Sequence, residues 1–186
     1  MWKDLPLRRR AEATIMCAFG IWLALVFIAP LTLPSGSVPD LSGSVGTVDN
    51  WQSIEQMNPL AGAVYLLGDS QCHQLLERSF VLNGNEMPFC TRDLGIFIGL
   101  VAGIAIAFSG RLRIGPRLSL LLLVPMALDG GAQLISNYES SNLIRLATGI
   151  AAGVAIAFLL DWFAAKMLEP KANPDPRASD DARGSA

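Results

Sequence analysis

The chain is poor in charge. Only 16% of its 186 residues are Asp, Glu, Lys or Arg, whereas 52% are hydrophobic, and the mean hydropathy is +0.42. A composition this apolar excludes an ordinary soluble domain. The acidic and basic residues nearly cancel to a net charge of −2, so the chain also lacks the basic surface that nucleic-acid binding requires. We therefore expect a membrane protein with no nucleic-acid partner.

Cysteine and histidine are scarce as well: there are three cysteines and one histidine. Cys17 lies within an apolar run, where we expect it to be chemically inert. Only Cys72 and Cys90 remain as a candidate pair, and the single histidine, His73, adjoins the first of them. Thiol and imidazole chemistry is therefore confined to one segment of the chain.

Long apolar runs are what the sequence does contain. Four of them have the roughly 17–25 residues that a transmembrane helix needs. They lie at about 12–31, 94–110, 117–136 and 143–165. We predict an all-α integral membrane protein with four transmembrane helices, one membrane domain over residues 1–168, and a disordered cytoplasmic tail over 169–186. The first run is long for a signal peptide and lacks a small-residue cleavage site, so we expect it to remain as an anchor.

Basic residues are distributed unevenly around these runs. With the N-terminus in the cytoplasm, eleven of the 14 Lys and Arg residues fall on the cytoplasmic side, as the positive-inside rule requires. We therefore predict that both termini are cytoplasmic. The exceptions, Arg78, Arg92 and Arg145, fall at the extracytoplasmic end of the helices, which indicates paired charges or an anion site. The eleven are Lys3, Arg8, Arg9, Arg10, Arg111, Arg113, Arg117, Lys166, Lys171, Arg177 and Arg183.

The connection between the first two helices predicts an extracytoplasmic cap over residues 51–93, made of short interfacial helices and a small hairpin. Residues 32–50, which precede it, are rich in Gly, Ser and Pro and are expected to form a flexible loop. Residues 51–67 are amphipathic, which favours an interfacial segment. Its membrane-facing side chains would be Trp51, Ile54, Met57, Val64 and Tyr65.

The rest of the cap brings the two cysteines together. Asp69 or Ser70 can cap a short helix that carries Cys72. The Asn83-Gly84 pair, between short apolar pieces, predicts a hairpin turn. That turn would return Cys90 toward Cys72, with their Cα atoms less than about 7 Å apart.

Alternative interpretations of this cysteine pair stay open. A disulfide would close a loop of about 19 residues and stabilise the fold by about 3 kcal/mol in the chain-entropy model. The predicted side of the membrane is oxidising in bacteria, which favours that bond. A site for zinc or another transition metal is the second interpretation, because zinc accepts thiolate, imidazole and carboxylate ligands. Its ligands would be Cys72, His73, Cys90 and Asp93. A reactive or redox-active thiol pair is the third.

Small residues recur at every fourth position in the second and fourth helices. They are Gly95, Gly99 and Gly103 in one helix, and Gly149 and Gly153 in the other. This spacing lets helix backbones approach closely in lipid. We therefore expect these two helices to form a close parallel pair.

The third helix carries a carboxylate in an apolar run. Asp129 and Gln133 are four residues apart and share a helix face. A charge in a membrane is costly and indicates function unless it is paired. Because only a short link separates the third and fourth helices, Arg145 is the predicted partner of Asp129 or of Glu139. A purely structural ion pair between the two helices is the alternative.

The polar residues fall into four motifs that resemble a known family. Cys-His-Gln-x-x-Glu-Arg-Ser-Phe, Pro-Phe-Cys-Thr-Arg-Asp-x-Gly-Ile, Pro-x-x-x-Asp-Gly-x-x-Gln and Ser-Asn-x-x-Arg-x-x-Thr-Gly begin at residues 72, 88, 125 and 141. In this order they are similar to the signature of the DUF2085 family of small prokaryotic integral membrane proteins. Members commonly carry a cysteine where this chain has Asp93. The resemblance implies a multi-pass protein of the prokaryotic plasma (inner) membrane with a shared polar site, and it supplies no activity.

Two classes of function follow, and the sequence leaves open whether the protein is an enzyme. The first is a membrane protein whose outward-facing polar pocket binds or processes an anionic lipid headgroup or a small ligand. The second is a non-enzymatic assembly factor or complex subunit with a disulfide-stapled cap; a metal-binding or transport-associated role is a lesser alternative. Besides the lipid bilayer, a homo-oligomer or a membrane complex is a candidate partner.

The residues proposed for the pocket are expected to converge in one charged cluster just below the outer surface. The catalytic candidates are His73, Glu77 and Asp129; histidine titrates near neutral pH and is suited to proton transfer. The ligand-binding candidates are Arg78, Arg92, Gln133, Asn142 and Arg145.

The predicted topology can be tested by cysteine accessibility labelling. Single cysteines placed in residues 32–93 or 137–142 should react in intact cells with a reagent that does not cross the membrane, because these segments are predicted to lie outside. Cysteines in either terminus or in residues 111–117 should react only after the cells are broken. Labelling of the C-terminal tail in intact cells would contradict the predicted orientation.

Overall fold

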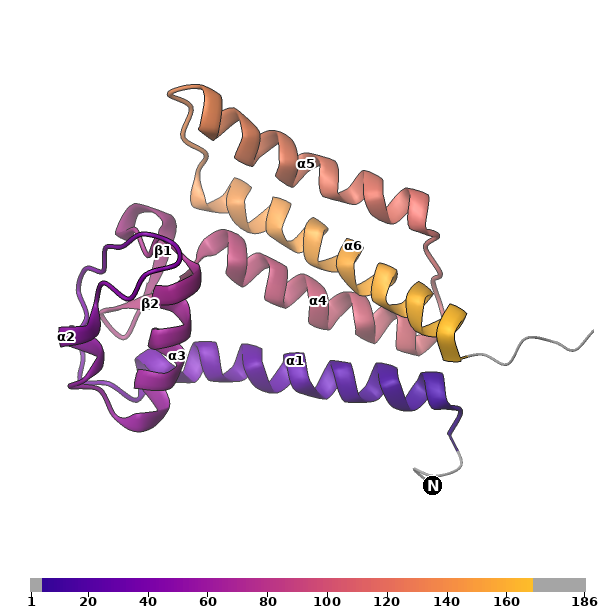
Figure 1. The fold of residues 1–186 in the computed structure, drawn as a ribbon, viewed down its shortest axis with the longest axis horizontal. Helices are drawn as coiled ribbons and strands as arrows, with labels where there is room; N and C mark the ends of the chain where they lie inside the picture. The colour runs from indigo at the N-terminus through magenta and orange to yellow at the C-terminus, as the bar shows by residue number, and fades with distance from the viewer. Residues whose placement is uncertain (1–4, 169–186) are drawn as a thin grey trace, which may run out of the picture.

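The computed structural model describes residues 5–168, so Lys3 and the predicted tail over 169–186 lie outside the described residues. Long helices dominate the described part of the chain, and four of them are long and apolar enough to cross a membrane. They are α1 (Leu7–Leu31), α4 (Thr91–Ser109), α5 (Pro116–Ile135) and α6 (Asn142–Leu168). Figure 1 shows them side by side, with the remaining elements gathered at one end.

The four helices coincide with the four predicted spans, and their ends differ by a few residues. Helix α1 begins at Leu7 rather than near residue 12, so the arginines that precede the apolar run belong to its first turns. Arg8 forms an ion pair with Glu12 one turn later, at 2.8 Å, which supports this early start. Helix α4 begins at Thr91, so Arg92 and Asp93 lie inside its first turn and not before it.

Residues 32–90 form a folded cap on one end of the bundle, here called the cap end (Figure 1). The cap contains helices α2 (Trp51–Ile54) and α3 (Pro59–Gln71), and a 3₁₀ helix at Leu76–Arg78. It ends with an antiparallel pair of strands, β1 (Ser79–Leu82) and β2 (Asn85–Cys90).

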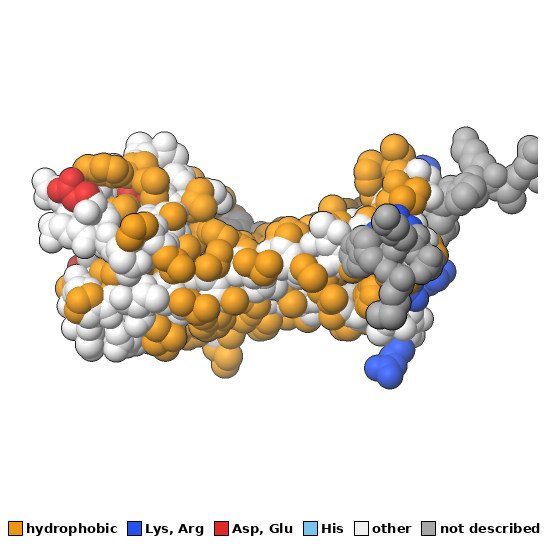
Figure 2. Space-filling view, turned by 90° about the horizontal axis from the view of Figure 1, so that it is seen from below, with side chains coloured by type: hydrophobic (Ala, Val, Ile, Leu, Met, Phe, Trp, Pro, Cys, Tyr) orange, Lys and Arg blue, Asp and Glu red, His pale blue; other side chains and the backbone are white. Residues whose placement is uncertain are grey.

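Figure 2 shows apolar side chains between the cap and the opposite end of the molecule, where Lys and Arg side chains gather. That opposite end, where α1 and α5 begin and α4 and α6 finish, is here called the basic end.

The prediction that residues 32–50 form a flexible loop is wrong. Leu33, Val38 and Leu41 are buried in the core of the cap. The loop backbone is held by two buried side chains of β2: Asn85 Oδ1 accepts from the Val38 N–H at 2.9 Å, and Glu86 Oε2 accepts from the Leu41 N–H at 2.7 Å. These bonds satisfy backbone groups that would otherwise be buried without partners.

Helix α3 is also placed differently from the prediction. Val64 and Tyr65 are buried rather than exposed at an interface, and the Tyr65 hydroxyl donates to the Glu86 carbonyl at 2.6 Å. Asn58 and Pro59, which interrupt the apolar pattern, form the start of this helix: the Asn58 side chain accepts from the Ala61 N–H, and proline occupies the first helical position. The helix then continues through Asp69 and Ser70, so neither residue caps a separate helix.

The predicted hairpin is confirmed. Strands β1 and β2 pair in an antiparallel register that sets Ser79 opposite Cys90. Asn83 and Gly84 connect them with φ values of +56° and +72°. A two-residue turn of the kind that matches strand twist needs positive φ at both positions, which asparagine and glycine tolerate. The turn brings Cys90 back to the end of α3.

Helices α4 and α6 pack most closely, through the predicted glycines, and run in the same direction (Figure 1). A Cβ atom on Gly103 would lie 2.6 Å from Ala157 Cβ, and one on Gly99 would lie 2.9 Å from Gly153 Cα. Neither position has room for a side chain. Helix α5 packs against α6 and α1 packs against α4, so α4 and α6 form the centre of the bundle.

This glycine contact predicts a position-specific effect of adding one methyl group. Gly99→Ala should lower the free energy of unfolding by about 1–3 kcal/mol, because the helices must separate to admit the Cβ. The matched control is Gly20→Ala in α1, where nothing lies within 4 Å of the new atom. That control should stay within about 1 kcal/mol of the parent protein. Unfolding in mixed detergent micelles measures both; equal losses would contradict the close contact.

Candidate functional site

Three arginines meet at the cap end. Arg78 comes from the 3₁₀ helix, Arg92 from the first turn of α4, and Arg145 from the first turn of α6. Because α4 and α6 are parallel and both begin at the cap end, their first turns lie beside each other. Helix α5 ends there and supplies Asp129 and Gln133. These residues, which are far apart in the sequence, thus form one group. It is here called the arginine cluster and contains Arg78, Arg92, Asp129, Gln133 and Arg145.

Arg92 and Asp129 form the central ion pair, which joins α4 to α5. Asp129 is buried, and its Oδ2 also accepts from Gln133 Nε2 at 3.1 Å and from the Ser140 hydroxyl at 3.2 Å. The Tyr138 hydroxyl approaches Oδ1 at 3.4 Å. Asp129 therefore acts chiefly as an anchor for its neighbours.

The prediction that Arg145 pairs with Asp129 or Glu139 is wrong. Asp129 forms its ion pair with Arg92 instead, and Glu139 forms its ion pair with Arg78, at 3.2 Å. The Gln133 amide explains the difference, because it lies between the two groups: its Nε2 donates to Asp129, and its Oε1 accepts from Arg145 at 3.2 Å.

Arg145 is buried and has no carboxylate within salt-bridge distance among residues 5–168. Arg145 as a whole residue is only 3% exposed. Its guanidinium donates to two neutral acceptors, Gln133 Oε1 and, at 3.5 Å, Asn142 Oδ1. The Nε atoms of Arg78 and Arg92 are also buried without a hydrogen-bond partner. The arginine cluster therefore holds three cations, two paired carboxylates and two buried N–H donors without an acceptor.

Two cavities adjoin the cluster. An open cavity of about 610 Å³ is lined by His73, Arg78, Arg92, Gln133 and Glu139, among others. A smaller one of about 80 Å³ is also lined by Arg78 and Arg92. It is lined in addition by Cys72, Cys90 and Arg145. The thiols and the arginines therefore face a common space.

The other predicted residues are divided between this space and the surface. His73 is exposed and lines both cavities. Glu77 is exposed and lines neither of them, so the structure does not bring this catalytic candidate to the site. Asn142 accepts from the Thr91 hydroxyl at 3.3 Å and thereby links the first turns of α4 and α6.

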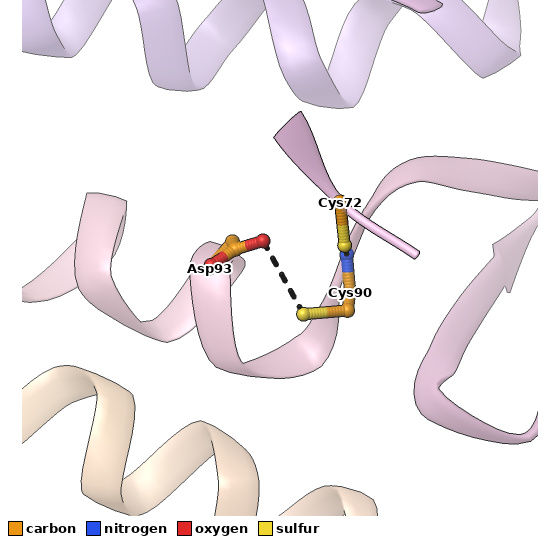
Figure 3. Close-up of side chains that lie close together, drawn as sticks. All are labelled: Cys72, Cys90 and Asp93. Atoms are coloured by element: carbon orange, nitrogen blue, oxygen red, sulfur yellow. Dashed lines mark hydrogen bonds between the residues drawn. The ribbon is translucent and has the colours of Figure 1, made fainter. Parts of the chain in front are cut away.

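Cys72, Cys90 and Asp93 lie together at the N-terminus of α4 (Figure 3). Their two sulfur atoms and one carboxylate oxygen all lie within 4.8 Å of one another. The Cys90 thiol donates to Asp93 Oδ2 at 3.3 Å, and the Cys90 N–H donates to Cys72 Sγ at 3.4 Å. The Cys72 and Cys90 sulfur atoms are not bonded to each other in this structure. Their mutual hydrogen bond, together with burial, raises the pKa of Cys72, and the same bond lowers the pKa of Cys90.

His73 is not part of this group, although we predicted it as a metal ligand. Cys72 has an extended backbone, with φ −129° and ψ 153°. In an extended chain successive side chains point in opposite directions. The Cys72 thiol points into the protein, and the imidazole that follows it points outward.

Sequence reasoning missed two sets of buried polar residues. Glu86 is buried in β2, and burial raises its pKa above the ordinary value of 4.5. At the basic end, Arg8 donates to Asp161 at 2.9 Å and contacts Glu12, and both carboxylates are buried. The signal available for Asp161 was a lone carboxylate inside an apolar helix. Arg8 and Glu12 have the four-residue spacing of a helical ion pair. The predicted first helix began near residue 12 and therefore did not include Arg8.

Comparisons with known proteins bear on the same residues. The profile of the family described as "Predicted membrane protein (DUF2085)" matches residues 72–159, which include the thiols and the arginine cluster. An uncharacterised protein of Methanocaldococcus jannaschii is 31% identical over 151 residues, covering 78% of this chain and 87% of that protein. An uncharacterised protein of Methanothermobacter thermautotrophicus is 36% identical over 91 residues, covering 47% of this chain and 82% of that protein. No solved structure matches the chain significantly.

The two ion pairs of the cluster should differ greatly in their effect on stability. Asp129→Ala should cost about 3–5 kcal/mol, because it removes a buried carboxylate and leaves the partly buried Arg92 without its anion. The matched change, Glu139→Ala, should cost less than about 1 kcal/mol, since the Glu139 side chain is 65% exposed and that of Asp129 only 6%. Detergent unfolding followed by circular dichroism gives both values. Similar losses for the two variants would show that the Arg92–Asp129 pair is not the anchor.

Proposed function

We propose that this chain, which belongs to the DUF2085 family of predicted membrane proteins, binds an anionic ligand through Arg145, Arg92 and Arg78 at the cap end of its helix bundle. The ligand class is an oxyanion, a phosphate or a carboxylate, carried either by a lipid headgroup or by a small soluble molecule. Its membrane location follows from the family and from the four apolar helices.

The observation that carries this proposal is Arg145, a buried guanidinium with neutral partners only. Placing a charge in a membrane protein without a counter-ion is costly, and such residues mark binding sites by default. In this cluster the two carboxylates that could have served Arg145 are already paired with Arg78 and Arg92. A bound anion would supply the missing negative charge.

The donor geometry fits an oxyanion better than a chloride-like ion. A guanidinium group presents several N–H donors in a plane and binds carboxylate or phosphate oxygens in pairs. Arg78 Nε and Arg92 Nε are buried without acceptors, and both residues line the same two cavities. His73 lines these cavities too, so it is the group best placed to exchange a proton with a bound ligand.

The distribution of basic residues predicts the side of the membrane from which a ligand would enter. Arg8, Arg9, Arg113 and Lys166 lie at the basic end or beside it, and basic residues favour the cytoplasmic side. The cap end and the arginine cluster would then face the extracytoplasmic side. A lipid headgroup would enter along the outer leaflet, and a soluble anion would enter from the aqueous compartment.

Binding measured on purified protein in a neutral detergent tests the proposal. The probes are phosphatidylglycerol, inorganic phosphate and, as a neutral lipid, phosphatidylcholine. We expect saturable binding of one of the two anions and none of phosphatidylcholine. Arg145→Gln should weaken that binding by about 10- to 100-fold, the effect of losing a charge-assisted hydrogen bond. The lipid and the soluble phosphate arms identify the source of the anion.

The matched control is Arg111→Gln, which removes the same charge from an exposed position in the loop between α4 and α5. It should bind as the parent protein does. Arg145→Lys keeps the charge but loses the planar set of donors, so it should fold normally and bind with intermediate affinity. Equal binding by the folded Arg145→Gln and Arg111→Gln variants would overturn the proposal and favour the structural alternative, an assembly factor with a stapled cap.

A further inference from the structure

We propose that Cys72, Cys90 and Asp93 bind one thiophilic divalent metal ion, with Zn²⁺ as the first candidate. The site would have three protein ligands, and its fourth position would open into the cavity that Arg145 lines. This inference goes beyond anion binding and does not depend on it.

The geometry of the three ligands carries the proposal. In a tetrahedral zinc site with bonds of about 2.0–2.3 Å, neighbouring ligand atoms lie about 3.3–3.8 Å apart. Here the Cys90 sulfur and Asp93 Oδ2 are already 3.3 Å apart, and all three ligand atoms lie within 4.8 Å of one another. A small side-chain adjustment would therefore close the site without moving the backbone.

Local structure explains why these three side chains meet. Cys90 is the residue immediately before α4 and Asp93 is in its first turn, so both face the same side of the helix start. Cys72 directly follows α3, and the hairpin register returns Cys90 beside it. The Cys90 N–H already donates to Cys72 Sγ, a contact that would also stabilise a metal-bound thiolate.

The charges balance when a metal enters. With both thiols protonated, the Asp93 carboxylate gives the three ligands one negative charge. Binding a divalent ion releases the two thiol protons and forms two metal–sulfur bonds and one metal–oxygen bond, so the net charge is unchanged and no redox partner is needed. The three ligands and the ion together thus carry the same net charge as the metal-free ligands.

Asp93 distinguishes this site from a simple cysteine pair. Figure 3 shows the Cys90 sulfur turned toward Asp93 Oδ2, with the Cys72 sulfur near the Cys90 backbone nitrogen. The small cavity beside the thiols, about 80 Å³ in volume, is lined by Arg92 and Arg145 as well. Three protein ligands with an open fourth position are typical of zinc sites that bind water or an exchangeable ligand.

Metal content and thiol counting on the full-length protein test the site together. Protein that has been reduced and freed of reductant is loaded with Zn²⁺ or Co²⁺, and unbound metal is removed by gel filtration. We expect about one ion per chain, and for Co²⁺ the absorption bands of tetrahedral thiolate coordination. In the loaded protein Cys72 and Cys90 should be protected from a thiol reagent, whereas Cys17, which lies in α1 away from the site, should react as it does in the metal-free protein. A chelator should restore the reactivity of Cys72 and Cys90.

Variants separate the ligands from the third cysteine. Cys72→Ser and Cys90→Ser should abolish stoichiometric binding, and Asp93→Asn should weaken it by at least ~10-fold, the minimum expected when a group that orients or binds the metal is lost. Cys17→Ser is the matched control and should bind as the parent protein does.

Failure to retain metal in reduced protein would overturn the proposal, as would equal retention in the Cys72→Ser, Cys90→Ser and Cys17→Ser variants. If two thiols of the isolated protein become reactive only on reduction, and the reduced protein binds no metal, the pair is a disulfide. Neither outcome affects the anion site, which Arg145→Gln tests with all cysteines in place.

Discussion

Three guanidinium groups at the cap end of this bundle share two carboxylates, and that imbalance governs the arrangement around them. Arg92 forms an ion pair with the buried Asp129, and Arg78 forms one with the exposed Glu139. Arg145 donates only to neutral oxygens. The Arg92–Asp129 pair fixes the end of α5 against the start of α4, and this places Gln133 in front of Arg145. Arg145 has only neutral acceptors, Asn142 and Gln133, because Asp129 is paired with Arg92.

Backbone packing makes this arrangement achievable. A Cβ atom on Gly149 would lie 3.2 Å from Gly95 Cα, so α4 and α6 are in direct contact in their second turns, beneath the cluster. This contact holds the starts of α4 and α6 side by side and so brings Arg92 close to Arg145. The cap then closes the site from the side, because the return of β2 to the end of α3 holds Cys72 and Cys90 at the cavity wall.

The features predicted correctly from the sequence are those set by local pattern. The four apolar runs predicted the long helices, and Asn83-Gly84 predicted the hairpin. The glycine spacing predicted the contact between α4 and α6. The errors arose where a distant group decided the outcome. Residues 32–50 look like a flexible loop because their backbone partners, Asn85 and Glu86, lie far along the chain.

The partners within the site depended on the same kind of information. The short link between α5 and α6 made Arg145 the nearest candidate for Asp129 in sequence, but Arg92 reaches it across the bundle. Which residues approach the site was predictable from where each helix begins and ends. Which arginine is left unpaired depends on side-chain geometry that no spacing encodes. The direction of the His73 side chain also could not be predicted from spacing, because it is set by the extended backbone of Cys72.

The central claim, that the Arg92–Asp129 pair anchors the cluster, is tested most directly by a double-mutant cycle in detergent unfolding. We expect Arg92→Leu and Asp129→Leu each to be strongly destabilising, because each strands the partner's charge. The double variant should be at least as stable as either single variant, with a coupling energy of about 3 kcal/mol, at the upper end for residues in contact. Losses that simply add would contradict the claim.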